Sequence, residues 1–139
     1  MSYVTSTEYI SRVISFYSRN TVKCGKLSFD EKSGRFVILD KKGKNVFDPD
    51  DGIHCGDIYL MSGLKGVWKF GQCELTADGI WVMCGTNITS KNYDKICPDI
   101  LYVKNKRLSR ITDEHIPINT NWGTVSDDFV RDVLRCKEI

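Results

Sequence analysis

Residues 53–61 read Ile-His-Cys-Gly-Asp-Ile-Tyr-Leu-Met, and this stretch decides how the surrounding chain is interpreted. Apolar and aromatic side chains dominate it, which favours a strand over 53–61. Gly56 interrupts the run, and a glycine within a strand pattern indicates a bend. The cluster at 48–52, Asp-Pro-Asp-Asp-Gly, predicts a turn just before it. We therefore expect a β module centred on His54-Cys55-Gly56-Asp57, which forms a bend within a sheet.

Short strands separated by turns extend from this stretch in both directions. The expected strands are 22–29, 35–39, 66–69, 71–75 and 80–84. Asp78-Gly79 lies between the last two, and this dipeptide between apolar runs favours a two-residue type I′ hairpin turn. Such a turn pairs Cys73 with Cys84. The inward face of the hairpin then holds Cys73, Leu75, Val82 and Cys84, and the more polar face holds Trp81 and Met83 with Glu74 and Thr76.

Amphipathic helices are predicted at both ends of the β module. Residues 7–19 have apolar side chains at helical spacing, namely Ile10, Val13, Ile14 and Tyr17. Residues 126–136 form the second helix, with Ser126 as its N-cap. Its expected core-facing side chains are Phe129, Val130, Val133 and Leu134. Between the module and this helix, 86–99 is typical of a loop and 100–111 of a second hairpin.

These patterns predict an α+β fold in one domain over residues 1–139. Its centre, at about 22–86, is an antiparallel β meander or small barrel, flanked by the N- and C-terminal helices. The chain is 41% hydrophobic and 27% charged, as expected of a soluble protein. We see no signal peptide and no apolar run of about 20 residues, so we expect neither secretion nor a membrane partner.

The formal net charge of +2 argues against a general nucleic-acid binder and against an acidic DNA mimic. Basic residues cluster locally at 41–44 and at 104–110. A short run of this kind is more often a solvated loop than a phosphate site.

Catalytic motifs are absent from the sequence. The only histidines are His54 and His115, and His54 and Cys55 would point to opposite faces of a strand, which opposes a Cys-His pair. No nucleophile elbow, phosphate-binding Gly-Lys-Ser/Thr loop or zinc-protease helix is present. We therefore expect a protein that is not an enzyme and requires no cofactor.

Six scattered cysteines leave two readings open, because none forms a Cys-x-x-Cys pair. One is a structural zinc site, with Cys73, Cys84, Cys24 and Cys97 as the candidate ligands and His54 or Cys55 in a supporting role. The other is that these thiols are small buried hydrophobic groups.

A partner-binding surface is predicted around Trp81, which the expected register places on the polar face of its hairpin. The basic segment after residue 103 supplies its charged part. The candidate residues there are Lys104, Lys106, Arg107 and Arg110.

Residues 25–85 resemble an uncharacterised family of small domains from phages and mobile elements of Gram-positive bacteria. The matching features are Gly25-x-Leu27, Arg35-Phe36, the stretch 52–57 with His-Cys-Gly-Asp, Trp68, and Gly79-Ile80-Trp81. The chain departs from the pattern at Cys73, where a basic residue is expected before Glu74. The resemblance implies a small β module, a mobile-element origin and the cytoplasm of a bacterial host, and it implies no activity.

Three hypotheses for function follow. The first is a phage or mobile-element inhibitor that binds a host protein, in particular an anti-CRISPR protein acting on a Cas nuclease, by analogy with small phage proteins that lack catalytic motifs. The second is a nucleic-acid-associated module of a mobile element. The third is a structural adaptor stabilised by zinc.

Overall fold

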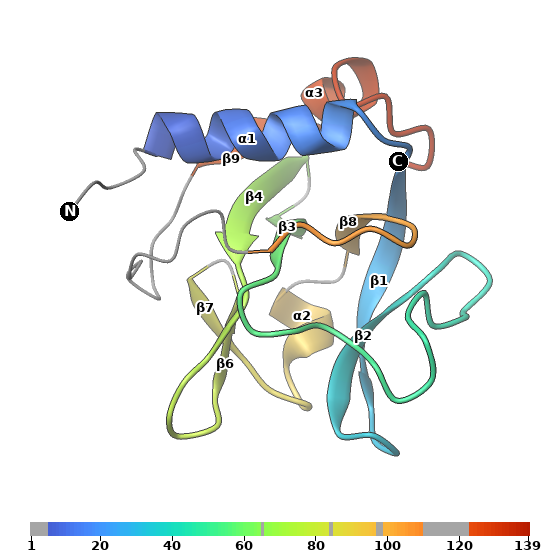
Figure 1. The fold of residues 1–139 in the computed structure, drawn as a ribbon, viewed down its shortest axis with the longest axis vertical. Coiled ribbons are helices and arrows are strands. Elements are labelled where there is room, and N and C mark those ends of the chain that lie inside the picture. Colours follow the sequence, from blue (N-terminus) through green and yellow to red (C-terminus); the bar gives the residue numbers. More distant parts are fainter. Residues whose placement is uncertain (1–5, 65, 84, 97–98, 110–122) are drawn as a thin grey trace.

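The computed structural model describes residues 6–64, 66–83, 85–96, 99–109 and 123–139. Three helices and nine strands lie in these ranges (Figure 1). The helices are α1 (Ser6–Ser18), α2 (Tyr93–Ile96) and α3 (Asp127–Asp132). The strands are β1 (Val22–Asp30), β2 (Arg35–Leu39), β3 (Ile58–Leu64), β4 (Val67–Gln72), β5 (Glu74–Leu75), β6 (Trp81–Met83), β7 (Thr86–Ile88), β8 (Asp99–Val103) and β9 (Thr124–Ser126). The predicted α+β class is confirmed.

The strands form two antiparallel sheets. The larger has six strands in the order β2-β1-β8-β3-β4-β9, and the smaller has three in the order β5-β6-β7. Because β8 pairs with both β1 and β3, strands distant in the sequence lie at the centre of the larger sheet. The sheets form neither a closed barrel nor a simple meander, so that part of the prediction is wrong.

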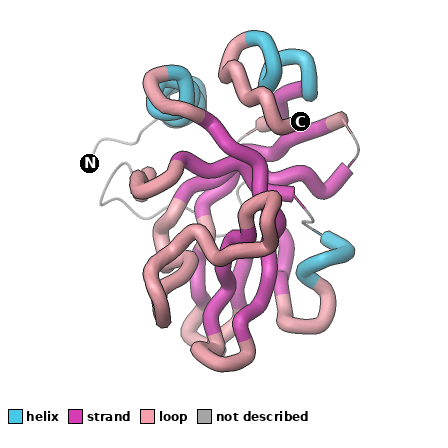
Figure 2. Tube along the Cα trace, turned by 90° about the vertical axis from the view of Figure 1, so that its right-hand side faces the viewer, coloured by secondary structure: helices cyan, strands magenta, loops and turns pink. Residues whose placement is uncertain are grey.

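Both faces of the larger sheet are buried. Ile58 and Leu60 of β3 contribute to one core, whereas Tyr59 and Met61 contribute to another. This alternation follows from the two-residue period of a strand, and burial on both faces explains the continuous apolar run at 58–61. Helices α1 and α3 cover the first face, while the small sheet and α2 cover the second. The two terminal helices lie at one end of the molecule and hairpin loops at the other (Figures 1 and 2).

The terminal helices begin close to where the sequence predicts them. In α1, the side chains of Tyr9, Val13 and Tyr17 recur every four residues and are fully buried. In α3, the Ser126 side chain accepts a hydrogen bond from the Phe129 backbone N–H at 3.2 Å, as an N-cap does. The helix ends at Asp132, four residues earlier than predicted, and Val133 is 46% exposed instead of facing the core.

His54-Cys55-Gly56-Asp57 forms a tight turn and is not part of a strand. The Asp57 N–H donates to the His54 carbonyl at 3.1 Å, and Gly56 adopts a φ of 98°. Residue 73 fixes this turn from outside, because the Gly56 N–H donates to the Cys73 carbonyl and the Cys73 N–H to the Asp57 carbonyl. Strand β3 begins only at Ile58, so the expected strand over 53–61 is wrong at its start.

The hairpin between β5 and β6 has a different register from the predicted one. Glu74 pairs with Val82 and Leu75 with Trp81, and the Thr76 N–H donates to the Ile80 carbonyl at 2.8 Å, which leaves a three-residue loop over 77–79 with Gly79 at a φ of 80°. A three-residue loop with glycine in the left-handed region is the next most common hairpin solution after the two-residue turn. Leu75 is consequently 44% exposed and does not lie on the inward face.

The segment after β6 is more ordered than expected. Residues 86–96 contain β7 and α2, where a loop is predicted. Strand β8 confirms the first arm of the second hairpin, but residues 107–109 form no strand, and 110–111 lie outside the described residues. Among the helices that the structure describes, none has the length and apolar character required to cross a bilayer.

Candidate functional site

The basic run at 41–44 and Lys104, the first residue of the second run, line one depression of about 700 Å³. Its cationic lining consists of Lys23, Lys41, Lys42, Lys44 and Lys104. Pairing of β1 with two partners causes this convergence, since Lys26 lies opposite Leu39 at the end of β2 and Val22 lies opposite Val103 at the end of β8. The loop after β2 and the turn after β8 therefore lie on either side of the first half of β1.

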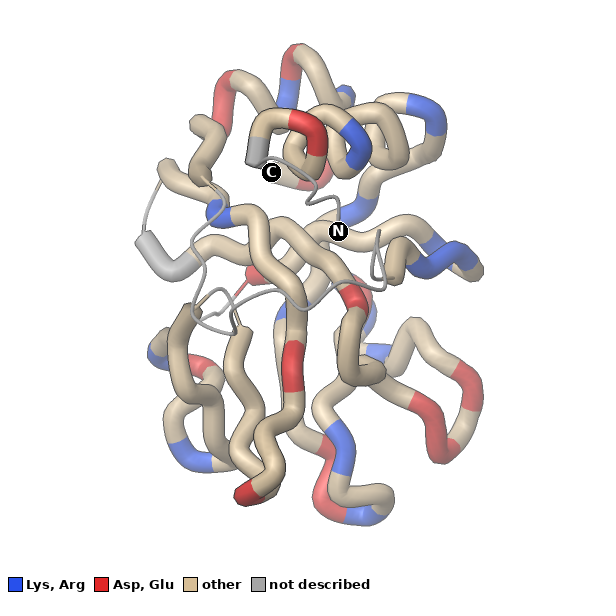
Figure 3. Tube along the Cα trace, turned by 60° about the vertical axis from the view of Figure 1, so that its left-hand side comes forward, with Lys and Arg blue, Asp and Glu red and all other residues tan. Residues whose placement is uncertain are grey.

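A second depression, of about 630 Å³, continues the first through the shared residues Lys23 and Glu138. It adds Arg19, at the end of α1, and Arg135 and Lys137, which follow α3. We call the combined cationic set the basic band: Arg19, Lys23, Lys41, Lys42, Lys44, Lys104, Arg135 and Lys137. Lys and Arg are blue in Figure 3, where most charged positions lie on loops and outer segments of the trace.

The lining of the basic band and the rest of the chain carry formal charges of opposite sign. Three acidic residues line the same depressions, namely Asp40, Asp48 and Glu138, so their lining carries a formal charge of +5. The whole chain carries +2, which leaves −3 for the remainder. The band therefore presents a local positive field that the net charge conceals.

Two of these three acidic side chains are already used to shape the band. Asp40 Oδ1 accepts hydrogen bonds from the backbone N–H groups of Lys42 and Lys44, each at 2.9 Å. The bond from Lys44, followed by the bond from Lys42, lowers the pKa of Asp40 despite some desolvation. Glu138 Oε1 accepts from the Cys24 N–H at 2.8 Å, beyond the point where β2 stops covering β1. These carboxylates hold the loop and the C-terminal segment in place.

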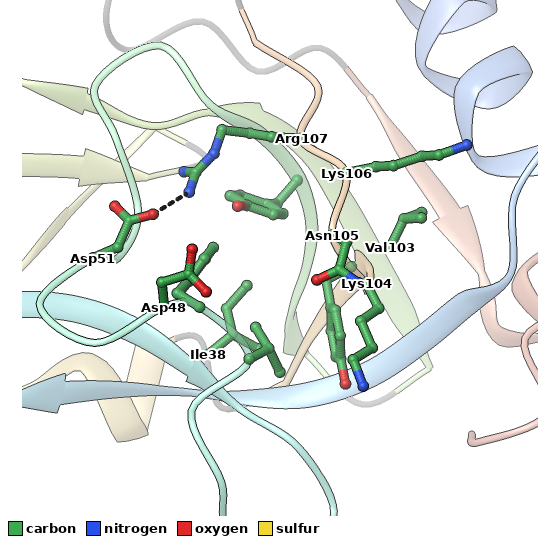
Figure 4. Close-up of a pocket in the computed structure, with 12 residues that line it drawn as sticks. Ile38, Asp48, Asp51, Val103, Lys104, Asn105, Lys106 and Arg107 are labelled. Carbon is green, nitrogen blue, oxygen red and sulfur yellow. Dashed lines mark hydrogen bonds and ion pairs between the residues drawn. The ribbon is translucent and has the colours of Figure 1, made fainter.

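A smaller cavity of about 310 Å³ opens beside the first depression, and we call it the side cavity (Figure 4). The two hollows share Val46, Phe47, Asp48, Tyr102, Lys104 and Asn105. Its remaining lining includes Ile38 and Tyr59, which are buried, and Asp51, Lys106 and Arg107 at its polar end. The cavity is therefore apolar on one side and charged on the other.

Arg107 closes the polar end of the side cavity through contacts within the protein. Its Nη1 donates to the Gly52 carbonyl at 3.0 Å and to the Asp57 carboxylate, and its Nη2 donates to Asp51 Oδ2 at 3.3 Å. The guanidinium also lies over the Phe47 ring, 4.9 Å from its centroid. Arg107 was predicted to bind a partner, but the structure commits its donors to the turn at 51–57.

Asp57 is the buried carboxylate at the centre of this network. Besides Arg107, it accepts from the His54 N–H at 2.9 Å, from Ser109 Oγ at 3.4 Å and from the Tyr59 hydroxyl at 3.5 Å. Burial and then the Asp57 charge raise the pKa of Tyr59, which keeps this hydroxyl protonated as a donor. The His-Cys-Gly-Asp signature is thus the frame of a structural ion pair.

Asp51 joins the same network at its exposed side. Its Oδ1 lies 2.6 Å from His54 Nε2, and its Oδ2 accepts from Arg107. Burial raises the pKa of Asp51. Hydrogen bonds from the Gly52 N–H and from His54, together with the charges of His54 and Arg107, lower it by a larger amount, so the net shift is downward. The network therefore favours the ionised form of Asp51.

The structure describes two of the four predicted zinc ligands, Cys24 and Cys73, and places them on opposite faces of the larger sheet. Cys24 packs against the core beneath α1, whereas Cys73 belongs to the core on the other face of the sheet. Burial raises the pKa of Cys24 to about 12, which disfavours the thiolate that binds zinc. Cys84 and Cys97 lie outside the described residues. Within the described ranges, no group of three or more metal-ligating side chains occurs.

The remaining predicted partner-binding residues are spread over different environments. Trp81 is half-buried, and its ring meets that of Phe36 edge-on at 6.3 Å, which makes it partly a core residue. Lys104 and Lys106 are exposed, and Lys106 Nζ donates to Asn20 Oδ1 at 2.8 Å. Arg110 lies outside the described residues.

Sequence reasoning recognised the run at 41–44 but did not place it in a site. It also missed the contributions of Arg19, Lys23, Arg135 and Lys137. No local pattern joins these residues, because only the β1 to β8 pairing and the docking of the C-terminal segment bring them together.

Comparison of the chain with protein-family models, with curated proteins and with solved structures finds no match.

Proposed function

We propose that the protein is a non-catalytic nucleic-acid-binding protein and that the basic band is its contact surface for phosphate groups. The observation that carries this proposal is the convergence of the basic run at 41–44, Lys104 and the segments that follow α1 and α3 on adjoining depressions. Lysines on separate segments that line two adjoining depressions suit the repeated negative charge of a nucleic-acid backbone.

The small net charge is compatible with this proposal. Affinity for a backbone depends on how many phosphates are neutralised at the contact surface and not on the charge of the whole chain. The lining carries +5 and the rest of the chain −3, so the field directs the molecule to one binding orientation.

The test is fluorescence anisotropy with labelled 20-nucleotide single strands and a duplex, at a series of salt concentrations. If about five phosphates of a single strand are neutralised, the logarithm of the association constant should fall against the logarithm of salt with a slope of about −3 to −4. Combined substitution of Lys41→Ala, Lys42→Ala and Lys44→Ala should weaken binding and flatten this slope by about 2.

The matched control removes three exposed lysines that lie elsewhere on the chain: Lys32→Ala, Lys91→Ala and Lys95→Ala. It changes the net charge by the same amount, so a loss confined to the first triple variant identifies the band as the contact surface. Absence of binding to every nucleic acid at low salt would refute the proposal.

The inhibitor hypothesis remains a prediction and has its own outcome in this scheme. An acidic protein surface is the alternative partner for the same lysines. A chain that binds no nucleic acid but inhibits a Cas nuclease in a cleavage assay, with inhibition lost in the first triple variant, would support the inhibitor and overturn the nucleic-acid proposal.

A further inference from the structure

We infer that the side cavity binds one unpaired nucleobase, with guanine preferred, from a strand whose phosphates lie along the basic band. The inference rests on the proposed function and adds a base-specific site to it. It predicts that the protein binds single strands in preference to duplexes.

The first argument is the position and size of the side cavity. It shares six lining residues with the lysine-lined depression, and Lys104 belongs to both. A nucleotide with its phosphate at Lys104 therefore has its base at the mouth of the side cavity. The volume of about 310 Å³ is at the lower end of the range for small-ligand sites and suits a single base. A paired and stacked base cannot enter such a hollow without leaving its helix.

The second argument is the division of the cavity wall into apolar and polar parts. Val46 and Phe47, which are half-buried, supply an apolar surface for the flat face of a base. Arg107 cannot move freely into the space, because Gly52, Asp51 and Asp57 hold its guanidinium. The cavity is thus held open by a network that exists without a ligand, which reduces the cost of ordering a site on binding.

The third argument concerns the carboxylate of Asp48, which supplies the base preference. Figure 4 shows this carboxylate directed among the lining side chains, between Arg107 and Ile38. Asp51 is occupied by His54 and Arg107, whereas Asp48 is exposed and its carboxylate has no hydrogen-bond donor among the described residues. Of the two carboxylates in this lining, Asp48 is therefore the one that remains as an acceptor for a ligand.

Base chemistry then selects guanine. An ionised carboxylate is an acceptor only, with two oxygens side by side. The Watson–Crick edge of guanine carries two adjacent donors, N1–H and the N2 amino group, which match both oxygens. Adenine and cytosine present one amino donor beside an acceptor nitrogen, and uracil presents one N–H between two carbonyl oxygens. Unpaired bases are recognised at these edges by side chains in many RNA-binding proteins.

The experiment measures affinity for ten-nucleotide RNA strands that differ in one position, with a single guanine, adenine, cytosine or uracil in the same oligoadenylate background. We expect the strand with guanine to bind about tenfold more tightly than the others, the effect of one bidentate contact. The variant Asp48→Asn, which replaces one acceptor oxygen by a donor, should abolish this preference. Lys104→Ala should weaken all four strands by a similar factor and keep the preference.

A direct readout of the site is the change in the NMR signals of residues 46–48 and 105–107 on addition of guanosine monophosphate. Inorganic phosphate at equal concentration is the control and should leave the signals of Val46 and Phe47 unchanged. Equal affinity for all four strands, or a duplex bound as tightly as a single strand, would overturn the base site and leave the backbone proposal intact. Failure of every strand to bind would remove both.

Discussion

Replacing Arg107 with methionine removes the charged partner of a buried carboxylate while retaining an unbranched side chain of similar length. The Asp57 side chain is 1% exposed and the Arg107 side chain 23%, so the ion pair is largely shielded from water. Breaking a buried pair by removing one partner costs about 3–5 kcal/mol, because the remaining charge is left uncompensated. His54, Tyr59 and Ser109 still donate to Asp57, so we expect the lower end of this range, about 3 kcal/mol.

The assay is urea unfolding followed by tryptophan fluorescence, with thermal unfolding as a second measure. A loss of about 3 kcal/mol should lower the melting temperature of a chain of this length by about 10 °C. Lys106→Ala is the neighbouring control and should change the free energy of unfolding by less than about 0.5 kcal/mol.

A double-mutant cycle isolates the ion pair from other losses. Asp57→Asn removes the buried charge and keeps an acceptor oxygen, so Arg107→Met should cost much less in that background than in the native chain. Equal costs in the two backgrounds, or a cost below about 1 kcal/mol in the native chain, would refute the assignment of Arg107 and Asp57 as a stabilising buried pair.

Two further predictions concern pH and packing. The pKa of Asp51 is lowered in the folded state, so the stabilisation from its ionised carboxylate is present above the ordinary pKa of 3.8 and is lost as the pH falls through the lower folded-state pKa. When the free energy of unfolding is measured against pH, Asp51→Asn should therefore lose less stability in acid than the native chain. Gly25→Ala would place a methyl carbon 2.6 Å from the Leu39 carbonyl oxygen, so we expect a loss of about 1–3 kcal/mol in urea unfolding. Gly34 has a φ of 70°, and a methyl group there would meet no atom within 4 Å, so Gly34→Ala should cost about 1 kcal/mol. A larger loss for Gly34→Ala than for Gly25→Ala would contradict the packing described for β1.

Elements specified by local sequence were predicted well. Strand β2 has the expected bounds, and α1 begins one residue before the predicted start and ends one before the predicted end. In both cases the period of apolar residues agrees with the surrounding turn or cap signals, so no distant contact is needed to choose between alternatives. The same holds for the start of α3 at its Ser126 cap.

The errors occur where distant residues decide the local structure. The turn at 54–57 reads as a bent strand because its flanks are apolar, yet the hydrogen bonds that stop the strand come from Cys73. The Asp78-Gly79 pair permits two hairpin loops that differ by one residue, and a shift of one residue exchanges the two faces of a strand. Leu75 therefore pairs with Trp81 instead of Val82 and is 44% exposed, while Cys84 of the predicted thiol pair lies outside the described residues.

The candidate site was only partly visible in the sequence for the same reason. The basic run at 41–44 and Lys104 were recognised separately, but their proximity depends on β1 pairing with β2 on one side and β8 on the other. Arg107 was predicted as a partner-binding candidate, and the sequence does not reveal that it pairs with Asp57, whose side chain is 1% exposed.

The pairing of β1 with β8 also determines when the protein becomes functional during its synthesis. The lysine at 23 and those at 41–44 leave the ribosome first, and the turn that carries Lys104 and the segment that carries Lys137 follow only later in translation. A nascent chain that ends before residue 99 therefore has an unpaired edge along the first half of β1 and no assembled groove. We expect chains shortened before β8 to expose this edge to aggregation, and binding to arise only once the segment that carries Lys137 has docked.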